Sequence, residues 1–556
     1  MKTKCFPFLI LTAMLLVMSC EESKPKADLI ITNAKIWTGN EPQKFAQSMA
    51  IAGDSIIAIG TDEDLQDYKG EQTEVIDAKG GFITPGFIDS HVHFIGGGSG
   101  LLSVDLRDAS TPEEFTKRIA DYAKQMEPGT WIKDGNWDHT LWGGELPKKE
   151  WIDEYTKENP VIVYRLDGHM ILANSLAMEI AGIDKNTPDI EGGEIVRNAD
   201  GTPTGILKDN AMNLLFEKIP PMTQTEKEKA FKAAMNYFLS NGVTSVHDVD
   251  GLSEGYGSYE TAKQLRESGD LSIRIYAAKP LSEWKALEAM ERQDDKWIKT
   301  GGLKGFVDGS LGSHTAAFKD VYTDKPTDKG FFVNTPEDLY QWISGADNAN
   351  LHVMVHAIGD SAITSLLNIY ERVIKEHGVK DRRFRIEHAQ HIAPEDIKRF
   401  AELNVIPSMQ PYHAIDDGRW AEAIIGSERI KTTYAFKSLW DANATLAFGS
   451  DWPVAPATPL EGIYAAVTRR TLDDKNSDGW VPQQKITVDQ ALTAYTKNAA
   501  YAAFEEGLKG TLEPGKLADF VMISEDLTMV DPVNIRDLKI LATYVGGKKV
   551  FENKGQ

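Results

Sequence analysis

The sequence predicts an α/β protein in which a TIM-like (β/α)8 barrel carries a large insertion after its first strand and adjoins a small β-sandwich. Eight short apolar segments alternate with helical stretches between residues 82 and 451, the order that such a barrel requires. The stretch between His93 and His247 is far longer than one strand–helix connection. Both ends of the chain instead show alternating β patterns, which favours a separate sandwich.

The N-terminus has the pattern of an export signal. Two lysines precede an apolar run from Phe6 to Met18, which is too short to span a bilayer. The run ends in LVMSC, which resembles a bacterial lipobox, so we expect residues 1–19 to be a signal peptide, Cys20 to be lipidated and residues 20–27 to form a tether. A plain signal peptide or an uncleaved anchor are the alternatives. The lipobox implies a cell-envelope protein, held to a membrane outside the cytoplasm through its N-terminal lipid only.

The predicted sandwich combines residues 28–80 with residues 507–556. Short apolar runs at both ends are separated by Gly and Asp turns, and such segments pair readily across a chain. The barrel is expected over residues 81–506. Within it, residues 105–240 have strands and helices of their own and are expected to form a cap.

The barrel strands are expected to be short and mostly apolar. An open doubly wound sheet is the alternative, but no GxGxxG turn follows the first strand. The expected strands are FITPGFID (82–89), TSVHDV (244–249), IRIYAA (273–278), LKGFVD (303–308), HVMVHA (352–357), FRIEHA (384–389), VIPSMQ (405–410) and TLAFGSD (445–451).

Charge and cysteine content limit the partners. The formal net charge of −23 opposes binding to nucleic acid phosphates, so no nucleic acid partner is expected. The chain has only two cysteines, Cys5 in the signal and Cys20, which leaves no disulfide in the mature domain. We expect a small-molecule partner. The oligomeric state stays open, with a homodimer as one option.

Histidines and an aspartate stand where the predicted strands end. His91 and His93 are two residues apart, so a continuing strand would point both rings to one face. His356, His388 and Asp451 end later strands. Because catalytic groups of a barrel gather at the C-terminal strand ends, we expect these side chains to converge on a divalent metal.

Lys304 lies in an apolar strand, where an unpaired ammonium would be costly. One explanation is pairing with a nearby carboxylate such as Asp308. The other is a neutral lysine that reacts with carbon dioxide and becomes an anionic carbamate between two ions. The composition does not decide between them.

These motifs together resemble the amidohydrolase superfamily. HVH, LKGFVDGSLGSHTAA, VHAIGDSAI, RIEHAQ, QPYH, FGSDWPV, TAYTKNAA and GTLEPGKLADFVMI are similar to the branch related to N-substituted formamide deformylase, amidohydrolase family 3. The similarity spans nearly the whole mature chain, and it includes the end sandwich and the cap.

The resemblance implies a centre with one or two divalent ions, for which zinc is expected. His91 and His93 would bind one ion with Asp451, and His356 and His388 would bind a second or complete a single site. Lys304 would be the carbamate bridge if two ions are present. The metal ligands expected in full are His91, His93, Lys304, His356, His388 and Asp451.

The resemblance also implies catalytic roles for Asp451 and Lys304. Asp451 would take a proton from the water that the metal activates and pass it to the leaving amine.

Substrate contacts are expected from the cap and from barrel loops. The candidates are Trp137, Asp138 and His169 in the cap, with His314, Gln410 and His413 on the loops. Each could equally be ordinary loop structure. Relatives often have arginine in place of His314, which weakens any expectation that a substrate carboxylate is bound there.

The expected function is hydrolysis of a non-peptide C–N bond in an amide, N-acyl amine or N-formyl amine by metal-activated water. The same machinery could serve a cyclic amide or a small dipeptide. A catalytically silent ligand-binding lipoprotein is a third hypothesis. It is disfavoured because every expected metal position is filled.

Overall fold

The computed structural model describes residues 24–554. The predicted signal peptide (1–19), Cys20 and the first part of the tether therefore lie outside the described residues. Within residues 24–554, no helix has the length and apolar character that crossing a bilayer would require.

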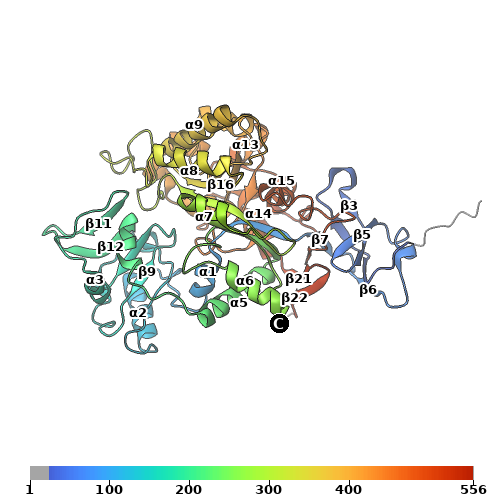
Figure 1. Cartoon of the computed structure of the whole chain (residues 1–556), viewed down its shortest axis with the longest axis horizontal. Helices are drawn as coiled ribbons and strands as arrows, with labels where there is room; N and C mark the ends of the chain where they lie inside the picture. Colours follow the sequence, from blue (N-terminus) through green and yellow to red (C-terminus); the bar gives the residue numbers. More distant parts are fainter. Residues whose placement is uncertain (1–23, 555–556) are drawn as a thin grey trace, which may run out of the picture.

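Eight parallel strands form the predicted (β/α)8 barrel, which confirms the expected fold class (Figure 1). A backbone bridge between Val92 and Trp452 and a hydrogen bond from the Asp451 N–H to the His91 carbonyl (2.8 Å) connect the last strand region to the first. In sheet order the strands are β8 (Phe87–Val92), β13 (Val243–Asp248), β14 (Arg274–Pro280), β15 (Ile298–Phe306), β16 (His352–Ala357), β17 (Arg385–His388), β18 (Ile406–Met409) and β19 (Ala447–Phe448).

Amphipathic helices cover the outside of the barrel. Helix α9 (Asp360–His377) turns Ile363, Leu366 and Tyr370 inward, and its last turn carries Lys375 and His377, which suit the negative end of the helix dipole. Capping residues set where several helices begin, because a side-chain oxygen satisfies a free backbone N–H there. The helices of this layer include α6 (Tyr259–Ser268), α7 (Trp284–Ala289), α8 (Pro336–Asn348), α10 (Ile397–Glu402), α13 (Phe436–Asp441), α14 (Pro459–Thr468) and α15 (Val488–Tyr495).

The two ends of the chain form a β-sandwich. One sheet has the order β5-β4-β1-β6 and the other β22-β21-β20-β7-β2-β3, so N- and C-terminal strands share the second sheet. The strands are β1 (Leu29–Thr32), β2 (Lys35–Trp37), β3 (Phe45–Ala46), β4 (Ser48–Ala52), β5 (Ser55–Gly60), β6 (Glu74–Asp77), β7 (Phe82–Pro85), β20 (Phe520–Ile523), β21 (Ile540–Val545) and β22 (Lys548–Glu552).

The first expected barrel strand, residues 82–89, is two strands in two sheets. β7 pairs with β2 and β20 of the sandwich, whereas only β8 pairs with β13 of the barrel. Gly86 separates them. A Cβ there would lie 2.2 Å from the Thr244 hydroxyl, so the chain can pass only without a side chain. The boundary between sandwich and barrel is therefore at Gly86 and not at residue 81.

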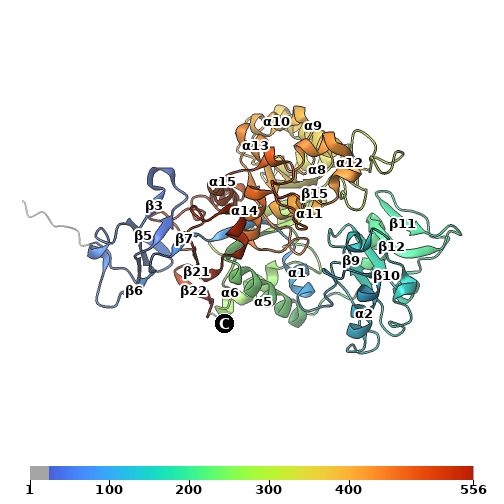
Figure 2. The ribbon, with the colours of Figure 1, turned by 180° about the vertical axis from the view of Figure 1, so that it is seen from behind.

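The insertion forms a cap with its own four-stranded sheet, ordered β11-β12-β10-β9. Figures 1 and 2 show the cap and the sandwich at opposite ends of the molecule, with the barrel between them. The cap elements are α2 (Pro112–Ala123), β9 (Ile162–Tyr164), β10 (Met170–Ala173), α3 (Ser175–Ala181), β11 (Gly193–Arg197), β12 (Pro203–Asp209) and α4 (Asn213–Phe216).

The cap ends before the predicted residue 240. Helix α5 (Gln224–Ser240) packs against α1 (Phe94–Gly100), and Phe231 and Phe238 from α5 both contact the ring of Phe94. These side chains belong to the barrel core. Helix α5 is thus part of the barrel layer, because its apolar stripe faces the barrel and not the cap sheet.

Candidate metal centre

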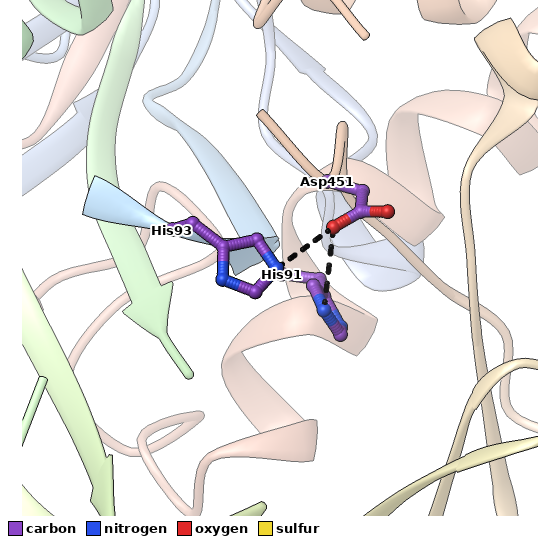
Figure 3. A group of neighbouring side chains, drawn as sticks. All are labelled: His91, His93 and Asp451. Carbon is purple, nitrogen blue, oxygen red and sulfur yellow. Dashed lines mark ion pairs between the residues drawn. The ribbon is translucent and has the colours of Figure 1, made fainter. Parts of the chain in front are cut away.

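The predicted ligands converge where the barrel strands end. His91 lies in β8, Lys304 in β15, His356 in β16 and His388 at the last position of β17. His93 follows β8 directly and Asp451 follows β19. His93 is therefore not on the strand as expected. It is the first residue of the turn into α1, and its ring still faces the same centre as His91 (Figure 3).

Asp451 lies at the middle of this group. Its Oδ1 is 3.5 Å from His91 Nε2 and 3.3 Å from His93 Nε2, as the dashed lines of Figure 3 mark. Its Oδ2 is 3.9 Å from His388 Nδ1. The Asp451 side chain is 9% exposed, and Oδ1 accepts no hydrogen bond within the described part of the chain.

The donor set fits a divalent cation. The ligand atoms of His91, His93 and Asp451 lie within 4.8 Å of one another, and those of His388, His413 and Asp451 do so as well. His413 Nε2 is buried and, like Asp451 Oδ1, unpartnered among residues 24–554. Buried polar atoms normally have partners, so unpartnered atoms on two residues of one donor group fit a cation held between imidazole and carboxylate donors.

His356 extends the cluster on the far side of His388. The two ring centroids are 4.5 Å apart, and the His91 and His388 centroids are 4.9 Å apart. The His356 Nε2 is 3.0 Å from the Gly309 carbonyl oxygen, to which it can donate. That bond would leave Nδ1 with its lone pair, as a metal ligand requires.

Lys304 also reaches the centre. Its Nζ is 3.3 Å from His91 Nε2, and the residue is 4% exposed. Burial lowers the pKa of the Lys304 amine. Asp308 does not pair with it: the Asp308 carboxylate instead accepts backbone N–H bonds from Ala317, Ile358 and Gly359 at 2.8–3.0 Å.

Two carboxylates behind the histidines were not predicted. Glu387 Oε2 lies 2.5 Å from His91 Nδ1, and Asp250 binds His93 Nδ1. Each carboxylate accepts a hydrogen bond from the Nδ1–H of its histidine and so leaves Nε2 directed at Asp451. Burial is the main cause that lowers the pKa of His91 to about 4. Asp250 overcomes the burial of His93 and raises its pKa to about 10.

The comparisons with known proteins identify the family. The family model described as "Amidohydrolase family" matches residues 74–551. The chain belongs to the amidohydrolase family. The Arabidopsis thaliana protein LONG AFTER FAR-RED 3 is 41% identical over 537 residues, which are 94% of this chain and 92% of the relative. The N-substituted formamide deformylase of Arthrobacter pascens is 26% identical, over 95% and 99% of the two chains.

A solved structure extends the comparison to the fold. An uncharacterized metal-dependent hydrolase from Pyrococcus horikoshii OT3 superposes with a TM-score of 0.74 at 28% identity, covering 91% of this chain and 99% of that one. The predicted family is thus confirmed. This amidohydrolase is a metal-dependent hydrolase of C–N bonds other than peptide bonds.

A cavity of about 650 Å³ opens above the centre of the amidohydrolase, between barrel and cap. This volume is in the range of small-molecule sites. Three of the six expected substrate residues line it: Asp138, His169 and His413. His169 comes from the cap, yet its ring centroid is only 5.1 Å from that of His356.

The other three expected substrate residues do not line the cavity. Trp137 is fully buried in the cap core, where its Nε1 donates to the Val163 carbonyl (2.9 Å). Gln410 lies behind His388 and accepts from its Nδ1 (2.9 Å). His314 packs on Tyr322 and bonds Asp324, away from the cavity wall.

The sequence carried a partial signal for the missed carboxylates. Glu387 is a charged residue inside the apolar strand FRIEHA, next to the predicted ligand His388, and Asp250 follows the strand TSVHDV. A buried charge in a strand needs a partner. The identity of that partner depended on the barrel closing, which places β17 across from β8.

Proposed function

We propose that this amidohydrolase cleaves N-acyl or N-formyl amines, with water as the nucleophile. The observation that carries the proposal is Asp451: a buried carboxylate with an unpartnered oxygen, surrounded by imidazoles at the floor of a small-molecule cavity. The relative named N-substituted formamide deformylase supports a formamide or a similar linear amide as the substrate.

The proposed metal ligands form two groups around Asp451. His91, His93 and Asp451 would hold one zinc ion, and His356 with His388 would hold a second ion or complete a single site. When bound, a divalent cation supplies a Lewis acid that polarises the carbonyl and brings the pKa of water towards ~7.

Asp451 handles the proton in this proposal. Burial raises the pKa of Asp451, but the neighbouring imidazoles of His93, His91 and His388 outweigh it and hold the pKa well below the usual range, so the carboxylate is ionised and able to accept. It accepts a proton from the attacking water at a carboxylate oxygen and then donates it to the leaving nitrogen. His91 and His93 stay fixed meanwhile, because Glu387 and Asp250 anchor their Nδ1 atoms.

A substrate panel tests the reaction. The purified, zinc-loaded protein should release amine from N-formyl and N-acetyl alkylamines. Hydantoins and dipeptides, included in the same assay, represent the cyclic amide and dipeptide alternatives. Turnover confined to those two classes, or absent for every linear amide, would overturn the proposal.

We further propose that Lys304 is carboxylated and bridges two ions. The support is its burial, its lowered amine pKa and its 3.3 Å approach to His91 Nε2. Protein prepared with 13C-bicarbonate should show a carbamate resonance that Lys304→Ala lacks, and it should bind two zinc ions per chain. One bound ion together with no carbamate signal would overturn this step and leave the hydrolase proposal intact.

We also propose that the chain is a lipoprotein anchored at Cys20 in the cell envelope. The support is the LVMSC sequence after a charged and apolar N-terminus. Expressed in a bacterial host, the wild type should partition with the detergent phase and incorporate labelled fatty acid. Cys20→Ser should lose both properties. A wild-type chain without label would contradict the proposal.

A further inference from the structure

Asp209 is a buried carboxylate in the cavity wall that the proposed chemistry does not use. It ends the cap strand β12, and its side chain is 2% exposed. Its Oδ1 is 2.7 Å from His169 Nδ1, and its backbone N–H donates to the His169 carbonyl (3.1 Å). Asp209 is thus hydrogen-bonded to His169 through both its side chain and its backbone.

The second oxygen of Asp209 has no partner. Oδ2 is buried and accepts no hydrogen bond from any described residue, although Asp209 is among the residues that line the cavity. The backbone of Asp209 adopts φ 45° and ψ −126°, a conformation that side-chain-bearing residues seldom adopt. A strained residue with an unpaired charged oxygen is typical of a binding site and costly elsewhere.

The location of Asp209 sets its distance from the chemistry. The His169 ring, whose Nδ1 contacts Asp209, is also close to the metal-centre residue His356, with a centroid separation of 5.1 Å. A group that reaches Asp209 Oδ2 is therefore next to His169 on the cap side of the cavity, and not at the ligand atoms of the metal centre. On a linear substrate this corresponds to a substituent a few bonds away from the amide.

The cavity wall as a whole is acidic. Among its lining residues aspartates outnumber lysine and arginine eight to two, so the formal charge of its Asp, Lys and Arg side chains is negative. Its one arginine, Arg165, already pairs with Asp167 (2.6 Å) and Asp138 (3.5 Å). The second cation is Lys304 in the metal centre. Among the described lining residues, no lysine or arginine outside the metal centre is left to receive a substrate carboxylate.

The remaining wall suits an aliphatic or cationic group. Tyr164, Phe216, Tyr256 and Trp420 line the cavity, and the first two rings stack at 5.8 Å. Aromatic faces attract ammonium and guanidinium groups and tolerate the methylene chain that carries them.

We propose that Asp209 determines substrate specificity by accepting a hydrogen bond from a cationic nitrogen, so that the preferred substrates are amides with an ammonium or guanidinium group a few bonds from the scissile bond. This inference rests on the proposed function for its substrate class. Asp209 contacts the substrate away from the reacting atoms. His169 is the positioning residue that fixes its carboxylate.

The test compares matched substrates. Mono-N-acetylated diamines with two to five methylenes keep their ammonium charged at neutral pH, since its pKa is about 10. N-acetylalkylamines of equal length are the neutral match, and N-acetylated ω-amino acids are the anionic match. In the wild type kcat/KM should be at least ~10-fold higher for the cationic than for the neutral member, and the anionic member should be poorest.

Asp209→Asn should abolish this preference. Asparagine keeps the shape and tolerates positive φ, so the fold should persist, and circular dichroism checks it. The ratio of kcat/KM for the cationic substrate to kcat/KM for the neutral substrate should fall ~10-fold or more, chiefly because KM for the cationic substrate rises. The kcat/KM for the neutral substrate should change less than ~3-fold. Asp200→Asn, in the exposed β11–β12 turn of the same cap, is the matched control and should leave the ratio unchanged. An unchanged ratio in Asp209→Asn would overturn the proposal and leave Asp209 as a structural residue.

A binding measurement separates this inference from the proposed function. Calorimetry on the zinc-loaded protein compares pentylguanidinium with neutral pentylurea. Tighter binding of the cation in the wild type, lost in Asp209→Asn, would support the acidic subsite even if no linear amide were hydrolysed. If amides are hydrolysed but the wild type shows no preference for the cation in turnover or binding, the inference is wrong and the proposed function stands. If Asp209→Asn does not fold, the preference of the wild type for the cation in turnover and binding decides whether the inference stands.

Discussion

Glu387 Oε2 and His91 Nδ1 are 2.5 Å apart across the barrel, and both side chains are fully buried. Glu387 is also bound by Arg385 through Nε at 2.7 Å and Nη2 at 2.9 Å. Arg385 thus fixes the carboxylate, which fixes the His91 tautomer, and the Nε2 atom faces Asp451 and Lys304 as a consequence.

Glu387→Gln should weaken zinc binding by about 10–100-fold, the usual effect of losing an outer-shell partner. A Gln amide can donate where His91 Nδ1–H also donates, so the ring loses its fixed orientation. Competition with a chromophoric chelator measures the affinity. Glu376→Gln on the exposed face of α9 is the control, and equal zinc affinity in all three proteins would contradict the prediction.

The same variant should be less stable without metal. Arg385 would lose a fully buried counter-charge, and breaking a buried pair costs about 3–5 kcal/mol. The thermal midpoint of the metal-free protein measures this effect separately from zinc affinity. A lowered midpoint with normal zinc binding would assign Glu387 a purely structural role.

Asp451→Asn should lower kcat by about 10²–10⁴-fold, because the amide cannot accept and return a proton. Substrate binding should be less affected than turnover, so KM should change little. Asp441→Asn, whose carboxylate pairs with Lys437 at the surface, should behave as the wild type. Zinc content must be measured in parallel, since a variant that retains both zinc and normal kcat would exclude Asp451 as the proton acceptor.

Much of the centre could be predicted because strand ends are local features. An apolar run that ends in a histidine or GSD is visible in the sequence, and the barrel topology brings such ends together. His356 and His388 lie at the expected ends of β16 and β17. His93 lies one position beyond β8, yet Asp250 holds its ring towards the same point.

The parts that could not be predicted depend on contacts between distant segments. Glu387 binds a histidine 296 positions earlier, and Asp209 matters because cap and barrel enclose one cavity. The aromatic character of Trp137 gave no hint whether it faces a core or a ligand. Likewise the run FITPGFID shows no break in hydrophobicity at Gly86, where the chain passes from sandwich to barrel.

Asp417 should make stability fall with rising pH. Burial raises the pKa of this cavity-lining carboxyl from 3.8 to about 7. Between these two values the unfolded chain is ionised while the folded protein keeps the proton, so ionisation favours unfolding by up to about 1.4 kcal/mol per pH unit. Above pH 7 both states are ionised and the effect levels off.

Asp417→Asn should remove this pH dependence. The thermal midpoint of the wild type relative to the variant should decline from pH 4 to pH 7 and then stay constant. The variant amide can still accept from Tyr434 and Gln390, which limits other effects. If the difference in thermal midpoint between the wild type and Asp417→Asn does not change with pH, the raised pKa of Asp417 is contradicted.

Trp137 should prove to be a core residue of the cap and not a substrate contact. Its ring packs edge-to-face on Phe115 (6.3 Å), and its Nε1 donates to the Val163 carbonyl. Trp137→Ala should cost about 3–5 kcal/mol of cap stability, as large-to-small changes in cores do, and Trp137→Phe should cost less. Trp142→Phe, at a half-buried cap position, is the control.

Limited proteolysis at 25 °C should cleave the cap of Trp137→Ala before that of the wild type. The fraction of Trp137→Ala that stays folded should keep KM within about 2-fold of the wild type, because the ring does not line the cavity. A large rise in KM for the stable Trp137→Phe protein would instead show that Trp137 contacts the substrate.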